Sequence, residues 1–455
     1  MKKLTRVLCA VFVAAMMVSC LCLPASAVTV DWNSVKLESL IDIMNSYVET
    51  SDELLDQGQY CMRGFAVSPD GRFAFGGFLN PNSAAALNII DLETARPGSS
   101  YVHEQTEGGR GYPKGIAVDD RNHVYVGEAY YQNYGAVNYA ILTYNEKGEL
   151  TEEGFYNVVT EGTPGDKNGT KMGVNGVDIL KLDGKYYMYL VVNYDMDRLY
   201  RFDVTDVKNP ALDTTFGTNG YVDLNAVHNF KEGQYLDVDV DGTIYIGATL
   251  NDGESGLYVL SADGKTMLNS AKCTKGYAVA IWEDFVFVST QSGPTCINVI
   301  DKVTMNQVAT LACHDGANSY VYITVVNNVL YVADQGSGAA DYDSIVVAPL
   351  SDAGKKIITD RKAAYAAALE TSASETTTPA PTPDNPTTTP TDTTTEKPAE
   401  TTPTPTKDTS TPAPTQNTTT EKPADTKGGC GSVVALGLMA CVIPAAVVVA
   451  KKKKD

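Results

Sequence analysis

The chain repeats one pattern of apolar and polar positions six times. Each copy has a short apolar run, a polar turn and a second apolar run that ends near a polar residue. Apolar runs joined by a tight polar turn are typical of β-hairpins. The copies begin at Gly64, Gly115, Gly176, Tyr235, Gly276 and Tyr320. The pattern therefore predicts six hairpins whose starts are 41 to 61 residues apart.

A third and a fourth apolar run follow each hairpin, so every copy supplies four strands. In the last copy the fourth strand is expected at residues 356–360. Strand repeats of this length are typical of β-propellers, in which radial four-stranded sheets protect most of their edges. We therefore predict an all-β fold, a six-bladed β-propeller over residues 60–360. Two β-sandwiches are the alternative, but they do not account for six copies in register.

Two segments outside the repeats have helical character. Within the N-terminal segment 28–59, apolar positions between residues 36 and 57 recur at helical spacing, and residues 361–370 are rich in alanine. We predict short flanking helices that pack together or cover the seam between the first and last blades. Because each repeat contains its own four strands, no exchange of strands between the chain ends is expected.

The amino-acid sequences of two repeats resemble those of known propeller families. "PKGIAVDDRNHVYVGEAYY", residues 113–131, and "LYVADQG", residues 330–336, look like repeats of the NHL and YVTN families and of the six-bladed gluconolactonase-like and TolB-like superfamily. The resemblance covers roughly residues 60–360. It implies the propeller fold, and because these motifs are structural it implies little about function.

The two ends of the chain predict export and anchoring. Residues 1–27 have the basic start, apolar middle and small-residue end of a secretory signal peptide, with lipoprotein cleavage before Cys20 as the alternative. Residues 371–427 are a Thr/Pro-rich segment that we expect to be a disordered stalk. Residues 428–455 combine an uncharged run with four terminal lysines, which predicts a transmembrane anchor. The tail also resembles bacterial surface-sorting signals. We predict a bacterial cell-surface protein held in its own membrane.

Charge and cysteine content exclude some classes of function. The formal net charge of −20 at pH 7 argues against binding of nucleic acid, which requires the opposite sign. Beyond the signal peptide and before the anchor, the cysteines are Cys61, Cys273, Cys296 and Cys313. They allow disulfides or a soft-metal site, with simple packing as the alternative.

The repeat alignment predicts a ring of polar residues around the channel. The residues just before the first strand of each copy face the channel mouth, and long loops on the same face carry tyrosines, which suit contacts with sugars or proteins. The alternative is a channel lined by polar residues because it holds water. The candidate ligand-binding residues are Arg63, Lys114, Asn175, Gln234, Lys275, Tyr130, Tyr131, Tyr134 and Tyr194.

A second ring lies at the ends of the second strands. Resemblance to gluconolactonase- and paraoxonase-type hydrolases implies a channel calcium, for which Glu128, Asn193 and Asp334 are the candidate ligands, although the family's own ligand motifs are not visible. Asn175 and Asp178 are oxygen donors that would add to the six to eight calcium requires. The run "DVDVDG", 237–242, matches half of a calcium loop but lacks the closing glutamate, so a strand turn is the better interpretation.

His228 and His314 precede inner strands and are the weak candidates for a general base, with chance placement as the alternative. Taken together, these features predict a surface-anchored binding module for an extracellular ligand, either a carbohydrate-like small molecule or a protein or glycan partner. A calcium-dependent lactonase or esterase is the alternative, and a non-catalytic envelope scaffold is the third interpretation.

Overall fold

The computed structural model describes most of the repeat region and its flanks. The chain divides into two units, residues 1–369 and 370–455, and in the second unit only residues 370–375 are described. The described ranges are 29–42, 61–79, 84–94, 96–104, 111–129, 138–158, 172–194, 197–290, 296–313, 320–335 and 344–375. The predicted signal peptide, the anchor and nearly all of the stalk lie outside them. No helix in these ranges is long and apolar enough to cross a membrane.

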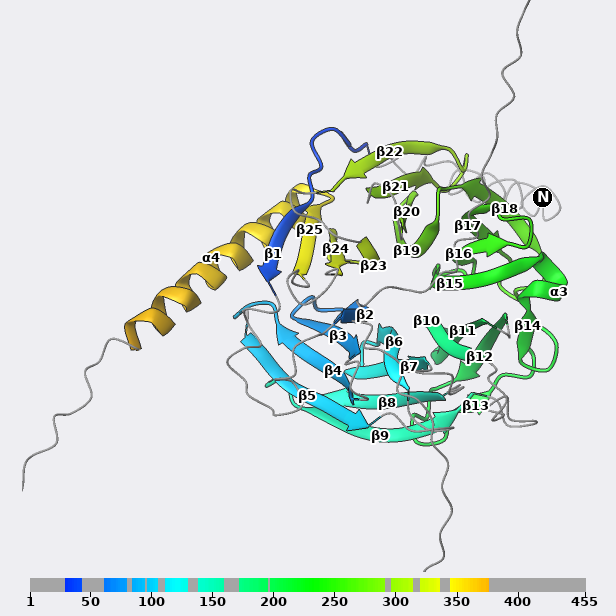
Figure 1. Ribbon diagram of the computed structural model, residues 1–455, viewed down its shortest axis with the longest axis horizontal. Coiled ribbons are helices and arrows are strands. Elements are labelled where there is room, and N and C mark those ends of the chain that lie inside the picture. The colour runs from blue at the N-terminus through cyan, green and yellow to red at the C-terminus, as the bar shows by residue number, and fades with distance from the viewer. Residues whose placement is uncertain are drawn as a thin grey trace, which may run out of the picture. The chain divides into compact units, whose positions relative to one another are not determined.

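The first unit is built from antiparallel sheets whose strands follow one another in sequence (Figure 1). The first sheet contains β2 (Cys61–Val67), β3 (Phe73–Leu79), β4 (Ala84–Asp91) and β5 (Arg96–Glu104). A second contains β15 (Phe230–Val238), β16 (Ile244–Leu250), β17 (Ser255–Leu260) and β18 (Met267–Lys272). A third contains β19 (Gly276–Trp282), β20 (Phe285–Thr290), β21 (Cys296–Asp301) and β22 (Gln307–Ala312). Each matches the four runs expected of one repeat.

A nine-stranded sheet joins the second and third repeats. Its first part contains β6 (Tyr112–Val118), β7 (His123–Ala129), β8 (Asn138–Tyr144) and β9 (Leu150–Asn157). Its second part contains β10 (Met172–Leu182), β11 (Lys185–Tyr194), β12 (Arg198–Asp203), β13 (Ala211–Leu212) and β14 (Tyr221–Asp223), followed by α3 (Leu224–His228). The two parts connect through one pair, Gly173 on β10 with Ala129 on β7.

The last sheet is closed by the N-terminal end of the chain. It contains β23 (Tyr320–Val326), β24 (Val329–Asp334), β25 (Ser344–Pro349) and β1 (Glu38–Asp42), where β1 pairs with β25. The helix predicted over 36–57 is therefore wrong for residues 38–42. Its apolar spacing also fits a strand with a register shift between Ser39 and Ile41, beside which Leu40 and Ile41 are both buried. The strand exchange that we did not expect is present.

The fourth strand predicted at residues 356–360 is also wrong, because this segment belongs to α4 (Asp352–Glu375). Ser351 Oγ accepts a hydrogen bond from the Gly354 N–H at 3.3 Å, which caps the start of the helix. With β1 on the outer edge of the sheet, the chain after β25 is free to form a helix instead. The helix predicted at 361–370 is confirmed as part of α4, which ends within the range assigned to the stalk.

The core lies between successive sheets. One apolar cluster packs β2–β4 against β6–β8, the next packs β6–β8 against β10–β12, and the series continues until β23–β25 pack against β2. Sheets that pack face to face in sequence and close on the first sheet form a β-propeller. In Figure 1 the strands nearest the centre are β2, β6, β10, β15, β19 and β23.

Every inner strand has a register shift near its start. The shifts fall between Met62 and Gly64, Pro113 and Gly115, Val174 and Gly176, Gly233 and Leu236, Gly276 and Val279, and Tyr320 and Tyr322. A bulge bends its strand and re-aims the side chain of the extra residue.

The glycines that follow three of these bulges allow neighbouring inner strands to approach. A Cβ on Gly64 would lie 2.3 Å from the Lys114 carbonyl oxygen, and one on Gly176 would lie 2.8 Å from that of Gln234. No side chain fits at such distances from a neighbouring backbone. The repeated glycine of the sequence pattern is therefore a packing requirement of adjacent inner strands.

Candidate functional site

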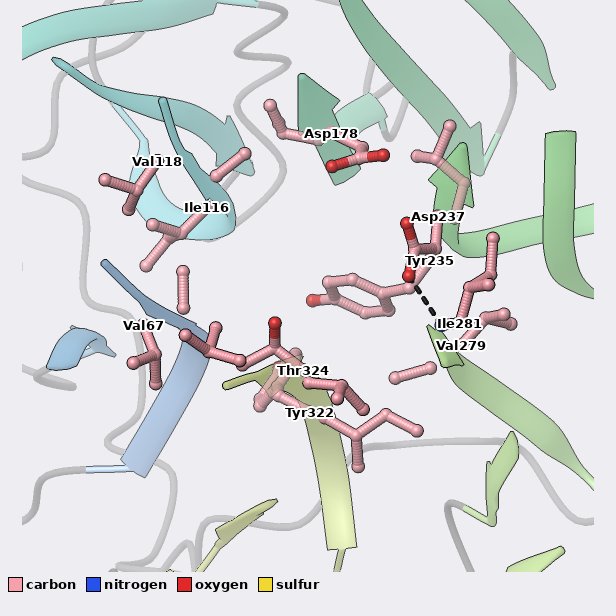
Figure 2. A pocket seen from close by; sticks show the side chains of 18 of the residues that line it. Val67, Ile116, Val118, Asp178, Tyr235, Asp237, Val279, Ile281, Tyr322 and Thr324 are labelled. Atoms are coloured by element: carbon pink, nitrogen blue, oxygen red, sulfur yellow. Dashed lines mark hydrogen bonds between the residues drawn. The ribbon is translucent and has the colours of Figure 1, made fainter. Parts of the chain in front are cut away.

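The inner strands enclose a cavity of about 490 Å³. Its wall is formed by the second halves of these strands and by the turns that follow them. Most of the lining residues are of apolar types, but polar atoms supply more of the exposed lining surface than apolar atoms do. Figure 2 shows ten of the lining residues with labels, which are Val67, Ile116, Val118, Asp178, Tyr235, Asp237, Val279, Ile281, Tyr322 and Thr324. Because all six inner strands contribute, the cavity is a property of the closed ring and not of any single repeat.

Three tyrosine rings lie at the inner end of this cavity. The Tyr235 ring lies 4.9 Å from that of Tyr322 and 5.2 Å from that of Tyr277, measured between centroids. The Tyr235 hydroxyl donates to the carbonyl oxygens of Arg63 and Lys114 at 3.3 and 3.4 Å. Burial raises the pKa of Tyr235 well above its ordinary value, so the hydroxyl stays protonated. The cluster lies between the cavity and the bulge residues.

Two aspartates occupy equivalent positions in the wall. Asp178 and Asp237 are the third residues of their repeats, and the strand register places Ala66, Ala117 and Ala280 at the equivalent position of other repeats. Asp178 Oδ2 accepts from the Val238 N–H at 2.8 Å, and Asp237 Oδ2 accepts from the Ile281 N–H at 2.7 Å. The charge of Asp237 also acts on Asp178. The two carboxyl groups therefore connect β10 to β15 and β15 to β19 while remaining partly open to the cavity.

The environment of this pair favours the protonated form. Burial raises the pKa of Asp178 well above its ordinary value, and the nearby charge of Asp237 raises it further. Burial also raises the pKa of Asp237 to about 6, against the opposing hydrogen bonds from Ile281 N–H and Asp178. A proton shared between the two groups relieves the charge repulsion between them.

We predict that this pair makes stability fall as pH rises. Its folded-state pKa values exceed that of an unfolded aspartate, about 3.9, so the folded protein binds more protons from about pH 4 to above pH 6. Stability is lost as pH rises through this window. Asp178→Asn replaces the carboxyl group by an amide that donates a hydrogen bond at every pH. The free energy of unfolding of this variant and of the wild type is measured in urea at pH 5 and pH 8. The variant should be more stable than the wild type, and the difference should be larger at pH 8 than at pH 5. Asp252→Asn, an exposed control, should follow the wild type. Parallel profiles for all three proteins would contradict the shared proton.

The predicted ligand ring lies at the other end of the inner strands. Arg63, Lys114 and Asn175 are the extra residues of their bulges, and Gln234 lies within the fourth bulge. Asn175 Nδ2 donates to Gln234 Oε1 at 3.0 Å. Lys275 precedes its strand, is exposed and has a φ of 50°. None of the five lines the cavity. Their role as ligand-binding residues stays a prediction.

The predicted calcium ligands are buried at strand ends. Glu128, Asn193 and Asp334 lie on β7, β11 and β24, and Glu128 Oε2 accepts from the Gly111 N–H at 2.8 Å. Asp178 lines the cavity instead. Among the described residues, no group of three His, Cys, Asp or Glu side chains is placed to hold a metal ion. The calcium site that includes the amide oxygen of Asn193 stays a prediction.

Two buried amide oxygens near this end remain unsatisfied. In the described part of the chain, the Oδ1 atoms of Asn175 and Asn193 have no hydrogen-bond partner. Buried carbonyl oxygens of this kind are most often satisfied by ordered water. They therefore agree equally with the water-filled channel and with a donor ligand, the two interpretations that the sequence left open.

The remaining candidates are only partly described. Tyr130, Tyr131, Tyr134 and His314 lie outside the described residues, and Tyr194 is described only as the end of β11. His228 is buried, and its Nε2 lies 2.7 Å from the Gly264 carbonyl oxygen, to which it donates. This contact gives His228 a structural role, and its catalytic role stays a prediction. Cys273, Cys296 and Cys313 are free thiols.

Comparison with known proteins supplies no family. No protein-family profile and no curated protein sequence matches the chain. Among solved structures, a chain of the mitotic checkpoint complex is similar over 64% of this chain and 75% of its own, with 11% identity and a TM-score of 0.40. Sqt1 of Saccharomyces cerevisiae is similar over 64% of this chain and 86% of its own, with 9% identity and a TM-score of 0.37. No functional conclusion is drawn from either likeness.

The cavity and its acid pair were not predicted as a site. Sequence reasoning assigned Asp178 to the calcium group and Asp237 to a strand turn. A usable signal was present, because two acidic residues stand where three other repeats have alanine in a strand interior. An acidic residue in a strand interior either forms a hydrogen bond or ion pair or has a shifted pKa, so it indicates a candidate site as a motif does.

Proposed function

We propose that the chain is a six-bladed propeller that binds a small organic molecule in the cavity of its inner strands. Support for six blades comes from the sheets, if each part of the nine-stranded sheet is counted as one blade. A relationship to the NHL and gluconolactonase-like propellers is supported only by the sequences of the repeats. The observation that carries the binding function is the cavity, whose lining includes Tyr235, Tyr322 and the carboxyl groups of Asp178 and Asp237.

The wall of the cavity favours a ligand with an apolar body. Valine and isoleucine are the commonest residues of the lining and come from several inner strands, and the polar side chains among them are three aspartates, two tyrosines, one threonine and one asparagine. Small-molecule sites commonly combine such walls with a small number of placed polar groups. A carbohydrate would require many more hydrogen-bond partners, and a protein segment would need a longer groove. We therefore favour a small molecule over the carbohydrate and protein ligands that the sequence also allowed.

Filling the cavity should abolish this binding. Thr324 is half-buried and lines the cavity, so Thr324→Trp places an indole in the space for the ligand. With 1-hexanol as the apolar probe, calorimetric titration of the purified full-length chain should show saturable binding that this variant loses. Thr310→Trp, on the exposed face of β22, is the matched control and should bind like the wild type. Equal binding by both variants, or no binding by the wild type, would refute the proposal.

We also propose that the propeller is displayed on a bacterial surface. The signal peptide, the Thr/Pro-rich stalk and the apolar tail with terminal lysines support this location. Protease treatment of intact cells should then release a fragment that contains the propeller, because a stalk of this composition is accessible to cleavage. Protection of the fragment until the cells are lysed would contradict surface display.

A further inference from the structure

The charges that line the cavity do not balance. Three aspartates contribute to its wall, and the lining residues include no lysine, arginine or histidine. Asp239 forms an ion pair with Lys302. A buried negative charge requires a positive charge or a proton to balance it, and in the described part of the chain no basic side chain forms an ion pair with Asp178 or Asp237.

The pair is held rigidly at the edge of the open space. A backbone N–H of the next inner strand fixes each carboxyl group, at 2.8 Å for Asp178 and 2.7 Å for Asp237. Figure 2 shows Asp237 near the Tyr235 ring and Asp178 on the neighbouring strand, farther from that ring. Because the anchoring donors belong to the backbone, they stay in place when the proton leaves. The site therefore has a fixed geometry for a donor that replaces the proton.

Two aromatic rings line the same cavity as the carboxyl groups. Tyr235 and Tyr322 both line the cavity, and their rings meet edge to face. A cation near an aromatic face is attracted by the ring quadrupole. A group that carries a positive charge, several N–H donors and an apolar body would match the carboxyls, the rings and the aliphatic wall together.

A bare metal ion matches the same site poorly. Calcium requires six to eight oxygen ligands, whereas this end of the cavity offers two carboxyl groups whose oxygens already accept hydrogen bonds. No described group of three His, Cys, Asp or Glu residues is placed to bind a metal there or elsewhere. The aliphatic wall adds no ligand atoms, and it leaves the greater part of the cavity unused by an ion.

We propose that the cavity recognises an organic ammonium ion, whose head group binds Asp178 and Asp237 and whose apolar body lies along the valine and isoleucine wall. This inference rests on the proposed function, since it names the class of ligand for the same cavity. In this proposal, Asp178 and Asp237 recognise the charge of the ligand, and the apolar residues of the inner strands recognise its apolar body.

Binding should compete with protonation of the pair. The charged or hydrogen-bonding groups that face it are Asp239 with Lys302, Tyr189 with Arg201, and Tyr245. Burial raises the pKa of both tyrosines above their ordinary value, so they stay neutral near pH 7. Asp237, whose pKa is raised to about 6, therefore changes charge between pH 5 and pH 8, and the pKa of Asp178 is raised in the same direction. The affinity for an ammonium ion should rise with pH across this interval, and that for a neutral probe should not.

The test compares hexylamine, which is charged at neutral pH, with 1-hexanol, its neutral counterpart. Calorimetric titrations of the full-length chain should give an affinity for hexylamine roughly tenfold or more above that for 1-hexanol, as expected of a charge-assisted hydrogen bond. The double variant Asp178→Asn and Asp237→Asn should lose this preference and still bind 1-hexanol. Asp252→Asn, which removes the charge of an exposed residue, should keep it.

The outcomes separate this inference from the proposed function. Binding of 1-hexanol with no preference for hexylamine would overturn the ammonium site and leave the cavity as a binding site. A preference that survives in the double variant would also overturn it. Displacement of hexylamine by stoichiometric calcium chloride would assign the pair to a metal instead. Failure of both probes to bind would refute the proposed function itself.

Discussion

Replacing Ile41 by alanine is expected to lower the free energy of unfolding by about 2–5 kcal/mol. Ile41 lies on β1, pairs with Ile345 of β25 and is 2% exposed. Its side chain belongs to the cluster that joins the first and last sheets of the ring. Truncating it leaves a cavity at the seam where the chain ends meet, and urea unfolding of the full-length variant measures the loss.

The neighbouring exposed residue provides the control. Ser39→Ala changes the same strand on its exposed face, so it should cost less than about 0.5 kcal/mol. If residues 36–57 formed a separate helix, as the apolar spacing suggested, Ile41→Ala would cost no more than a surface substitution. A loss below about 1 kcal/mol would therefore count against strand closure.

Replacing Tyr235 by alanine is expected to cost about 3–5 kcal/mol, the range for a large buried aromatic side chain. The ring is almost fully buried and contacts both Tyr277 and Tyr322 in the centre of the ring of strands. No other part of the wall can collapse into the vacated space, because six inner strands hold it open. Thermal and urea unfolding of the full-length chain should both report the loss.

The conservative variant separates packing from hydrogen bonding. Tyr235→Phe keeps the ring and removes a hydroxyl whose hydrogen bonds to Arg63 and Lys114 carbonyls are long, at 3.3 and 3.4 Å. It should cost about 0.5–1.5 kcal/mol. Equal losses for the two variants would show that the hydroxyl, and not the ring, closes the inner end of the cavity.

The sequence pattern predicted most strands correctly because the apolar runs and turns that define a hairpin lie within a few residues of each other. Apolar runs joined by tight polar turns, which contain Asp-Gly in three repeats, placed the hairpins of all six repeats. The glycines that begin several inner strands marked where neighbouring backbones approach. The same reasoning failed at residues 38–42 and 356–360. A short apolar run satisfies helical and strand spacing equally, and its choice depends on which edge is free to pair with it.

The candidate site shows a similar division. Arg63, Lys114, Asn175 and Gln234 were correctly recognised as equivalent positions, but only the register shifts show that they are bulge residues. The cavity itself is formed by residues from six repeats, so no segment of sequence contains it. The shared proton of Asp178 and Asp237 likewise requires two strands, β10 and β15, to bring their third residues together.

The sequence by itself determined the repeat, the order of strands within each sheet except the last, and the acidic character of the chain, because each depends on neighbouring residues or on composition alone. The tertiary structure decided how the ring closes, where the cavity lies and what state its carboxyl groups adopt. These depend on contacts between residues far apart in the chain, such as Ile41 with Ile345 and Asp237 with Ile281. Burial then changes the chemistry of a side chain in a way that its position in the sequence does not encode.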